Sequence, residues 1–142
     1  MQNKLKIHTT NYFETFIEVA EDTKVVNGTK PISKRDKKSV AEMQFDLINK
    51  HPYTYTSDDI LFHVYAEKND VTKNEYQQAR EAFFSKRQPC LCASPLTKTY
   101  GFGIHFDSKG KAALYGMETE DYQKFLEDEK IKKVKAMRTH KK

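Results

Sequence analysis

The sequence predicts an α+β fold in which a small antiparallel sheet, made of an N-terminal strand and a central hairpin, packs against three to four helices. The first observation behind this prediction is the alternation of large and small residues over 100–106, followed by a turn and a second apolar run at 112–117. Such a pattern is typical of a β-hairpin. The second is a set of three helix-start signals between residues 39 and 75. The third is a stretch of β-forming residues at 12–20, which supplies the remaining strand.

The length of 142 residues suits one domain, which we expect to span residues 1–142 with a loose N-terminus at 1–11 and a basic tail at 138–142. No apolar run is long enough to cross a membrane, and no signal region opens the chain. The sequence therefore predicts a cytoplasmic protein without a membrane partner. Two cysteines separated by one residue do not form a disulfide framework, which agrees with a reducing compartment.

The first strand and the first helix have clear local signals. Tyr12–Ala20 is rich in β-branched and aromatic residues, and it is the predicted first strand. Ser39-Val-Ala-Glu42 is a capping box, in which the serine and glutamate side chains satisfy backbone amides at a helix start. The first helix should begin there and end before Pro52, because proline disfavours helical geometry in the residue before it.

Two further helices are predicted before the connector. Thr56 or Ser57 caps the second, although its apolar body at 60–66 also has the composition of a strand. The capping box Thr72-Lys-Asn-Glu75 opens the third helix, which should end near Arg87.

The predicted hairpin joins Thr99–Phe106 to Ala112–Met117 through a glycine-containing turn. With Phe106 opposite Lys111, the bulky aromatic side chains lie on one face, and three glycines lie with His105 on the other. Glycine within a strand costs stability and indicates close approach by a backbone or by a ligand. We therefore expect the bare face either to be covered by a helix or to bind a ligand beside His105.

Beyond the hairpin, Thr119 is expected to cap a short fourth helix. After it, the spacing of Ile131, Val134 and Met137 suits a helix, whereas the alternating lysines suit an edge strand. Both alternatives stay open at this point.

The net charge of +5 is concentrated at the C-terminus. Residues 130–142 contain seven basic side chains and no acidic one, and a second basic cluster lies at 30–38. Basic clusters can neutralise nucleic-acid phosphates, but a lysine-rich end is also typical of a solvated tail. Three helices followed by a hairpin match a winged helix-turn-helix as well, with 72–86 as the recognition helix. One alternative function is therefore winged-helix-like nucleic-acid binding, with the basic tail as a further contact.

Cys90 and Cys92 could be thiolate ligands together with His63 or His105, but structural zinc requires four ligands and there is no second cysteine pair. We therefore predict no metal site and no cofactor, and we interpret both cysteines as small buried hydrophobic residues. A third alternative is a thiol-dependent enzyme with Cys90 as nucleophile and His105 as base. The common catalytic motifs are absent, so a non-enzymatic protein is favoured.

Four segments are similar to those of a known family. They are TFIEVAED from Thr15, HPYTYT from His51, AFFSK-x-QPCL-x-ASPL-x-K-x-YG-x-GIH from Ala82 and KAMR from Lys135. Together they resemble a family of small bacterial proteins of unknown function, over most of the chain. The resemblance implies a single small domain and brings no activity, cofactor or catalytic residue with it. In the family pattern position 92 is usually arginine and position 87 glycine, so a Cys-x-Cys metal site is less expected here and Arg87 would lie in a mildly strained helix cap.

The sequence thus favours a non-catalytic binding module for an anionic small molecule or a protein partner. Basic, hydroxyl and imidazole side chains surround a proline-stiffened connector beside the glycine-bearing face of the hairpin. The predicted binding residues are Lys86, Arg87, Ser94, Lys98, Tyr100 and His105.

Overall fold

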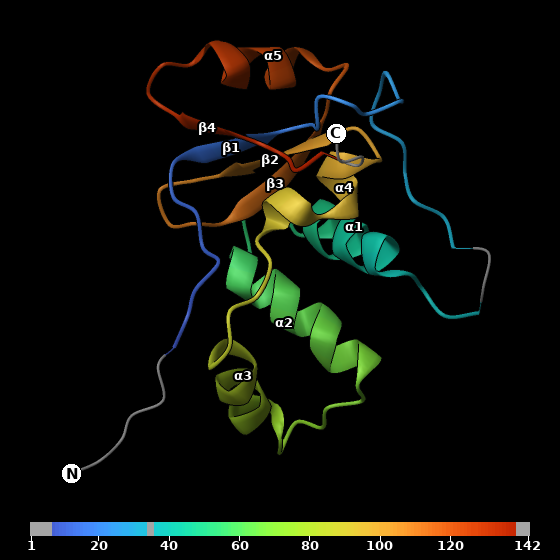
Figure 1. The fold of residues 1–142 in the computed structure, drawn as a ribbon, viewed down its shortest axis with the longest axis vertical. Helices are drawn as coiled ribbons and strands as arrows, with labels where there is room; N and C mark the ends of the chain where they lie inside the picture. The colour runs from blue at the N-terminus through green and yellow to red at the C-terminus, as the bar shows by residue number, and fades with distance from the viewer. Residues whose placement is uncertain (1–6, 34–35, 139–142) are drawn as a thin grey trace.

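The computed structural model describes residues 7–33 and 36–138 and confirms the predicted α+β fold (Figure 1). None of the described helices is long and apolar enough to cross a membrane. In chain order the elements are β1 (Thr15–Glu18), α1 (Val40–Lys50), α2 (Ser57–Lys68), α3 (Tyr76–Phe84), the short 3₁₀ helix η1 (Leu91–Ala93), α4 (Pro95–Lys98), β2 (Phe102–Phe106), β3 (Ala112–Gly116), α5 (Glu120–Glu127) and β4 (Lys132–Lys135).

The four strands form one sheet in the order β3-β2-β1-β4. β1 pairs antiparallel with β2, and β2 with β3, as predicted, whereas β4 runs parallel to β1. The segment after Lys130, for which helix and edge strand were both open, is therefore an edge strand. The parallel pairing is possible because the chain crosses one face of the sheet through α5, from the β3 edge to the β4 edge (Figure 1).

Helices cover both faces of the sheet. α5 lies on one face, α1 and α4 lie on the other, and α2 and α3 extend away from the sheet beyond α1 (Figure 1). The main core lies between the sheet and the helices on its α1 face. The fully buried residues there include Ile17, Ile104, Leu91 and Leu96. Burying one aliphatic side chain of this size stabilises the fold by about 1.5–3 kcal/mol. The connector around Leu91 is therefore part of the core.

The predicted caps set the starts of α1 and α2. At α1 the Ser39 hydroxyl accepts the amide of Glu42 at 3.2 Å, while the Glu42 carboxylate accepts the amide of Ser33 and does not close the box. At α2 both halves of a capping box form between Thr56 and Asp59. Thr56 is thus the cap, and the segment with a strand-like composition is a helix.

α3 is shorter at both ends than predicted. The Glu75 carboxylate accepts both the amide and the hydroxyl of Thr72, so the two residues close a turn that precedes the helix. At the other end the side chain of Gln88 donates to the carbonyl of Phe83. The side chain of Gln88 thus satisfies a carbonyl that would otherwise need a backbone amide from a further helical turn. The helix therefore ends before Arg87.

The hairpin forms, but its register differs by one residue from the prediction. Phe106 pairs with Ala112 and not with Lys111. The cause lies in the turn, where the Asp107 carboxylate accepts the amide of Lys111 at 2.9 Å and keeps that residue out of the strand. The shift moves Tyr115 from the bulky face to the opposite face, where the imidazole lies.

The bare face of the hairpin is covered by a helix. A Cβ atom at Gly103 would lie against the Phe16 ring and 2.7 Å from an atom of the Tyr122 ring. Phe16 itself packs on Tyr122 and Phe125 of α5, with ring centroids 5.1 and 5.0 Å apart. Of the two expectations for this face, close packing by a helix therefore accounts for the glycine at position 103.

The N-terminal segment, which was predicted to be loose, is hydrogen-bonded from His8 onward. The amide of His8 donates to the carbonyl of Phe84 at 2.8 Å. Thr10 donates to the Asp58 carboxylate through both its amide and its hydroxyl, each at 2.7 Å. Residues 1–6 of the predicted loose segment lie outside the described residues.

Candidate functional site: a tyrosine–histidine cluster

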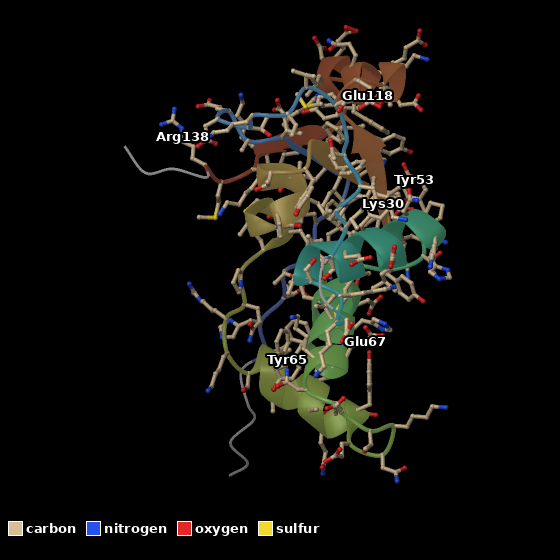
Figure 2. The ribbon with its side chains drawn as sticks, turned by 90° about the vertical axis from the view of Figure 1, so that its right-hand side faces the viewer. Lys30, Tyr53, Tyr65, Glu67, Glu118 and Arg138 are labelled. Carbon is tan, nitrogen blue, oxygen red and sulfur yellow. A yellow bond between two sulfur atoms is a disulfide. The ribbon has the colours of Figure 1, made fainter. Side chains whose placement is uncertain are left out.

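Three hydrogen-bonding side chains form a chain at the β3 edge of the sheet. The hydroxyl of Tyr53 lies 2.8 Å from Nδ1 of His105 and 2.7 Å from the hydroxyl of Tyr115. Figure 2 shows Tyr53 between the end of α1 and the sheet. Tyr53 is 37% exposed, so this tyrosine–histidine cluster reaches the surface.

The backbone around Tyr53 places its ring beside β3. After α1 ends, Tyr53 adopts a left-handed conformation with a φ of 56°. Its amide donates to the carbonyl of Ala112, and the amide of Ala112 donates to the carbonyl of Tyr55, so the chain continues along the edge of β3. A non-glycine residue in this conformation costs roughly 1–3 kcal/mol and persists where the surroundings hold it, often at functional sites.

His105 and Tyr115 reach the cluster because both point to the α5 side of the sheet. The imidazole stacks on the ring of Phe125 with a centroid distance of 4.2 Å, and Tyr115 meets the same ring edge-on at 4.8 Å. Phe125 in turn stacks on the buried ring of Phe16. An aromatic layer therefore backs the cluster and fixes its two inner members.

Tyr53 and His105 both favour their neutral forms. Burial raises the pKa of Tyr53 well above its ordinary value, and the hydrogen bond with Tyr115 raises it further. Burial lowers the pKa of the His105 imidazole below its ordinary value of 6.5, although neighbouring acids act in the opposite direction. At neutral pH Tyr53 and His105 are therefore both uncharged and joined by a hydrogen bond.

Four carboxylates act electrostatically on the tyrosine–histidine cluster. Burial is the largest cause of the raised pKa of Tyr53 and of the lowered pKa of His105. Two carboxylates raise the pKa of Tyr53 further, because they disfavour a phenolate. Three carboxylates act against the lowering of the His105 pKa, because they favour an imidazolium. These carboxylates disfavour an anionic ligand beside His105, although the Lys111 ammonium also lies near Tyr53, where it donates to the carbonyl of Thr54. These carboxylates, which we call the acidic rim, belong to Glu14, Asp107, Asp121 and Asp128.

The structure does not bring the predicted binding residues together. Lys86 and Arg87 are exposed in the connector that follows α3. Ser94 is buried on the α1 side of the sheet, where its hydroxyl donates to the side-chain oxygen of Gln44 at 2.6 Å. His105 faces α5 on the other side of the sheet. The connector and the imidazole therefore do not share one site.

The remaining two predicted residues lie near the end of α4. Lys98 is its last residue and is half-buried. Tyr100 lines a cavity of about 790 Å³ whose basic walls come from Lys37, Lys38 and Lys68. Tyr100 thus lies with two lysines of the basic cluster at 30–38 and with Lys68, none of which was a predicted binding residue.

Tyr53 and Tyr115 were missed as site residues. Tyr53 lies in the HPYTYT segment that carried part of the family resemblance, which was the available signal. Tyr115 was assigned to the wrong face because the predicted register was shifted by one residue.

The cysteine predictions need correction. Cys90 and Cys92 are joined by a disulfide, so they are not two separate small hydrophobic side chains. Cys90 lines a hollow on the α1 side of the sheet, and His105 lies on the α5 side, so the predicted nucleophile and base are not paired. Within residues 7–33 and 36–138, no group of three or more His, Cys, Asp or Glu side chains is placed to hold a metal ion.

The winged-helix arrangement is not formed. The hairpin pairs with β1 inside the main sheet, and α3 packs on α2, away from the hairpin (Figure 1). At the C-terminus Arg138 and Lys135 both contact the carboxylate of Glu21, at 3.0 and 3.5 Å. Residues 139–142 of the predicted basic tail lie outside the described residues.

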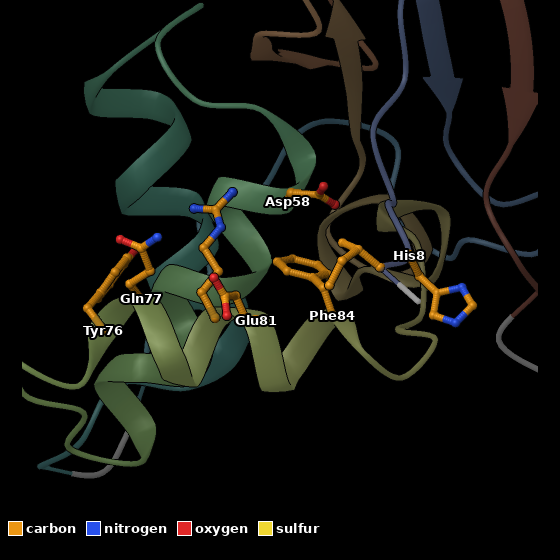
Figure 3. A pocket seen from close by; sticks show the side chains of 8 residues that line it. His8, Asp58, Tyr76, Gln77, Glu81 and Phe84 are labelled. Atoms are coloured by element: carbon orange, nitrogen blue, oxygen red, sulfur yellow. The ribbon is translucent and has the colours of Figure 1, made fainter. Parts of the chain in front are cut away.

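A second cavity, of about 430 Å³, lies between α3 and the N-terminal segment (Figure 3). Tyr76 lies at one end of it and His8 at the other, and Phe84 supplies an apolar wall between them. Charged side chains of both signs also line it, and its arginine, Arg80, is already paired with Asp59 at 2.9 Å. The electrostatics of this cavity therefore favour neither an anion nor a cation.

The fold and the cluster together define a small α+β protein with a four-stranded mixed sheet and an exposed hydrogen-bonded tyrosine at the sheet edge. The chain belongs to DUF6157, a family of unknown function whose model matches residues 7–142. This match confirms the resemblance to a family of unknown function. Comparison with curated proteins and with solved structures finds no match.

Proposed function

We propose that the protein is a non-catalytic binding module that recognises a basic surface of a protein partner through the tyrosine–histidine cluster. The observation that carries this proposal is the exposed Tyr53 side chain, whose hydroxyl is held by both His105 and Tyr115. Tyrosine is enriched among the residues that dominate binding energy at interfaces. Its ring supplies apolar contact area, and its hydroxyl stays hydrogen-bonded when the surface is covered.

The pre-set geometry of Tyr53 supports recognition. Binding costs free energy when flexible side chains must be ordered, and a ring already held in one orientation avoids much of that cost. The left-handed backbone of Tyr53 and its two hydroxyl contacts provide such an orientation. Because Tyr53 and His105 favour their neutral forms, covering them does not remove an ionised phenol or imidazole from water.

The acidic rim selects the class of partner. Its carboxylates act on Tyr53 and His105, and a surface of acidic and aromatic side chains attracts lysine and arginine by charge and by contact with the ring faces. A partner with a basic patch therefore fits this surface better than an anionic small molecule does.

A non-catalytic role fits the protonation states. A tyrosine base requires a phenolate near neutral pH, and the raised pKa of Tyr53 opposes its formation. The imidazole of His105 is enclosed between Tyr53 and Phe125. Both groups are therefore better placed to maintain the shape of the binding surface than to transfer protons to or from a substrate.

Affinity capture with matched variants tests the proposal. The immobilised protein is incubated with extract of the organism that makes it, and retained proteins are quantified at low and high salt. A basic partner should be retained by the wild type and lost at high salt, because exposed charge pairs are screened. It should be lost in Tyr53→Ala and kept in Tyr65→Ala, since Tyr65 is 39% exposed but lies on α2, away from the cluster.

The variants also define the contradicting result. Circular dichroism first establishes that each variant is folded. The proposal would be contradicted if the folded Tyr53→Ala and Asp121→Asn variants retained the partner as well as the wild type does. Recognition would then occur at another surface. In that case the tyrosine–histidine cluster has only a structural role.

A second candidate function, binding of an anionic small molecule, is supported by the cavity beside Tyr100. Its lysines give it the charge that the acidic rim lacks, although Lys38 is already paired with Asp46 at 2.6 Å. Inorganic phosphate is a suitable probe, and a titration followed by NMR should shift the resonances around Tyr100 in a saturable way. Lys68→Ala should weaken this shift, and the absence of a saturable shift in the wild type would remove the candidate.

A further inference from the structure

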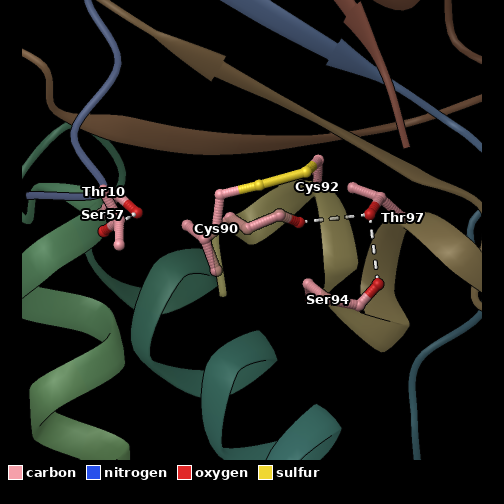
Figure 4. The surroundings of a disulfide bond; sticks show 7 residues. Thr10, Ser57, Cys90, Cys92, Ser94 and Thr97 are labelled. Atoms are coloured by element: carbon pink, nitrogen blue, oxygen red, sulfur yellow. Dashed lines mark hydrogen bonds between the residues drawn. A yellow bond between two sulfur atoms is a disulfide. The ribbon is translucent and has the colours of Figure 1, made fainter. Parts of the chain in front are cut away.

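Cys90 and Cys92 form a disulfide in the connector between α3 and α4. Figure 4 shows the sulfur bridge beside Ser94 and Thr97. The two Cα atoms are 5.3 Å apart, within the range that disulfides span. The bridge belongs to neither the tyrosine–histidine cluster nor the cavity beside Tyr100.

Hydrogen bonds that do not involve sulfur hold the backbone around the bridge. The carbonyl of Cys90 accepts the amide of Ala93 at 3.0 Å, and the carbonyl of Cys92 accepts the amide of Met137 at 2.9 Å. The Thr97 hydroxyl donates to two carbonyls of the same turn (Figure 4). Opening the disulfide therefore leaves the turn in place, with both thiols near each other.

The bridge adds little to the stability of the fold. The stabilisation by a disulfide grows with the length of the loop that it closes, and this loop contains a single intervening residue. That residue, Leu91, is fully buried in the main core and anchors the turn by packing. The protein can therefore stay folded with the bridge open.

One of the two sulfur-bearing residues borders a hollow. Cys90 lines a cavity of about 150 Å³ together with Phe83, Pro89 and Leu61, whereas Cys92 is not among its lining residues. A thiol that enters this hollow meets Cys90 first. Exchange then breaks the bridge with Cys92 as the leaving group.

We propose that Cys90–Cys92 is a redox-active disulfide that accepts two electrons from a dithiol reductant. A thiolate of the reductant attacks Sγ of Cys90, the bond between the two protein sulfurs breaks, and Cys92 leaves as a thiolate that takes up a proton. The second thiol of the reductant loses its proton and attacks the reductant sulfur of the mixed disulfide. Cys90 leaves as a thiolate and is protonated. The protein thus gains two thiols while the reductant becomes a disulfide.

Equilibration of the full-length protein with mixtures of reduced and oxidised dithiothreitol tests the proposal. After an acid quench, free thiols are alkylated and counted by mass spectrometry. We expect no alkylated cysteine at the oxidising end, two at the reducing end, and the same midpoint from both directions. Two alkylated cysteines at the oxidising end, or a transition that does not reverse, would overturn the proposal.

Single-cysteine variants identify the attacked sulfur. Cys92→Ser keeps the thiol that borders the hollow, and Cys90→Ser keeps the other one. With oxidised glutathione, the mixed disulfide should form at Cys90 at least about tenfold faster than at Cys92, because access controls the rate of exchange. Equal rates in two folded variants would contradict the assignment of Cys90.

Circular dichroism of the reduced wild-type protein gives a readout that needs no variant. An unchanged spectrum is expected, because the turn keeps its hydrogen bonds and its packing. Loss of structure on reduction would instead identify the bridge as a structural link and overturn the proposal.

Discussion

The hydroxyl of Tyr53 lies 2.8 Å from Nδ1 of His105, although 52 residues separate the two in the chain. The contact joins the turn after α1 to β2, and it spans β3, whose Tyr115 lies 2.7 Å from the same hydroxyl. One phenol thus connects three chain segments at the surface. Its removal should affect stability as well as binding.

Replacing Tyr53 by phenylalanine should remove both hydrogen bonds and keep the ring. Each such bond contributes about 0.5–1.5 kcal/mol, so we expect the free energy of unfolding to fall by about 1–2 kcal/mol in urea denaturation. Tyr65→Phe is the matched control, because Tyr65 is similarly exposed and its hydroxyl has no hydrogen-bond partner in the described part of the chain. Equal losses in the two variants would contradict the hydrogen-bonded chain.

Asp70 should be a site of stabilising substitution. It follows the end of α2 with a φ of 50°, and the amide of Val71 donates to the carbonyl of Ala66 across the turn. Helix ends of this kind favour glycine at the left-handed position. We expect Asp70→Gly to raise the free energy of unfolding by about 0.5–1 kcal/mol in urea denaturation. Asp70→Ala keeps the backbone strain, so an equal gain from alanine would assign the effect to the lost charge.

Gly103 should not tolerate even a methyl group. An added Cβ would overlap the Phe16 and Tyr122 rings, which are packed between the sheet and α5. We expect Gly103→Ala to lower the free energy of unfolding by about 1–3 kcal/mol, measured by thermal denaturation. Gly116→Ala is the control, because the nearest atoms there belong to the end of the Glu118 side chain, which can shift at the cost of its hydrogen bond with the amide of Gly28. A Gly103→Ala protein as stable as the control would show that the space beside the hairpin is open.

Local signals were sufficient for most elements. The caps at Ser39, Thr56 and Thr119 each involve a side chain and an amide three residues away, and all three form, although the predicted capping box at Ser39 closes only in that half. The turn at Thr72–Glu75 shows the limit of such signals, because the same side-chain pair closes a turn outside the helix. A capping motif thus indicates a helix start only when the following residues pack as a helix.

The candidate site depends on contacts that no local pattern contains. Tyr53 meets His105 only because its backbone turns left-handed and then pairs with the edge of β3. The hairpin register, which decides whether Tyr115 shares this face, is set by the Asp107 side chain inside the turn. A register error of one residue therefore removed a site residue from the prediction, because it inverted the face of every residue on β3.

The half-buried imidazole of His105 should weaken the folded state as the pH falls below about 6.5. Burial is the main cause of its lowered pKa, and the unfolded chain returns the group to its ordinary value of 6.5. Between these two pKa values the unfolded chain binds more protons than the folded one. The contribution to stability is therefore complete above pH 6.5 and is lost as the pH falls through the folded pKa.

Urea unfolding over about pH 7.5 to 5.0 should show this loss in the wild type but not in His105→Gln. The His63→Gln variant is the control and should also show the loss, because the His63 side chain is exposed on α2. The same pH slope in the His105→Gln protein would mean that another group causes the dependence.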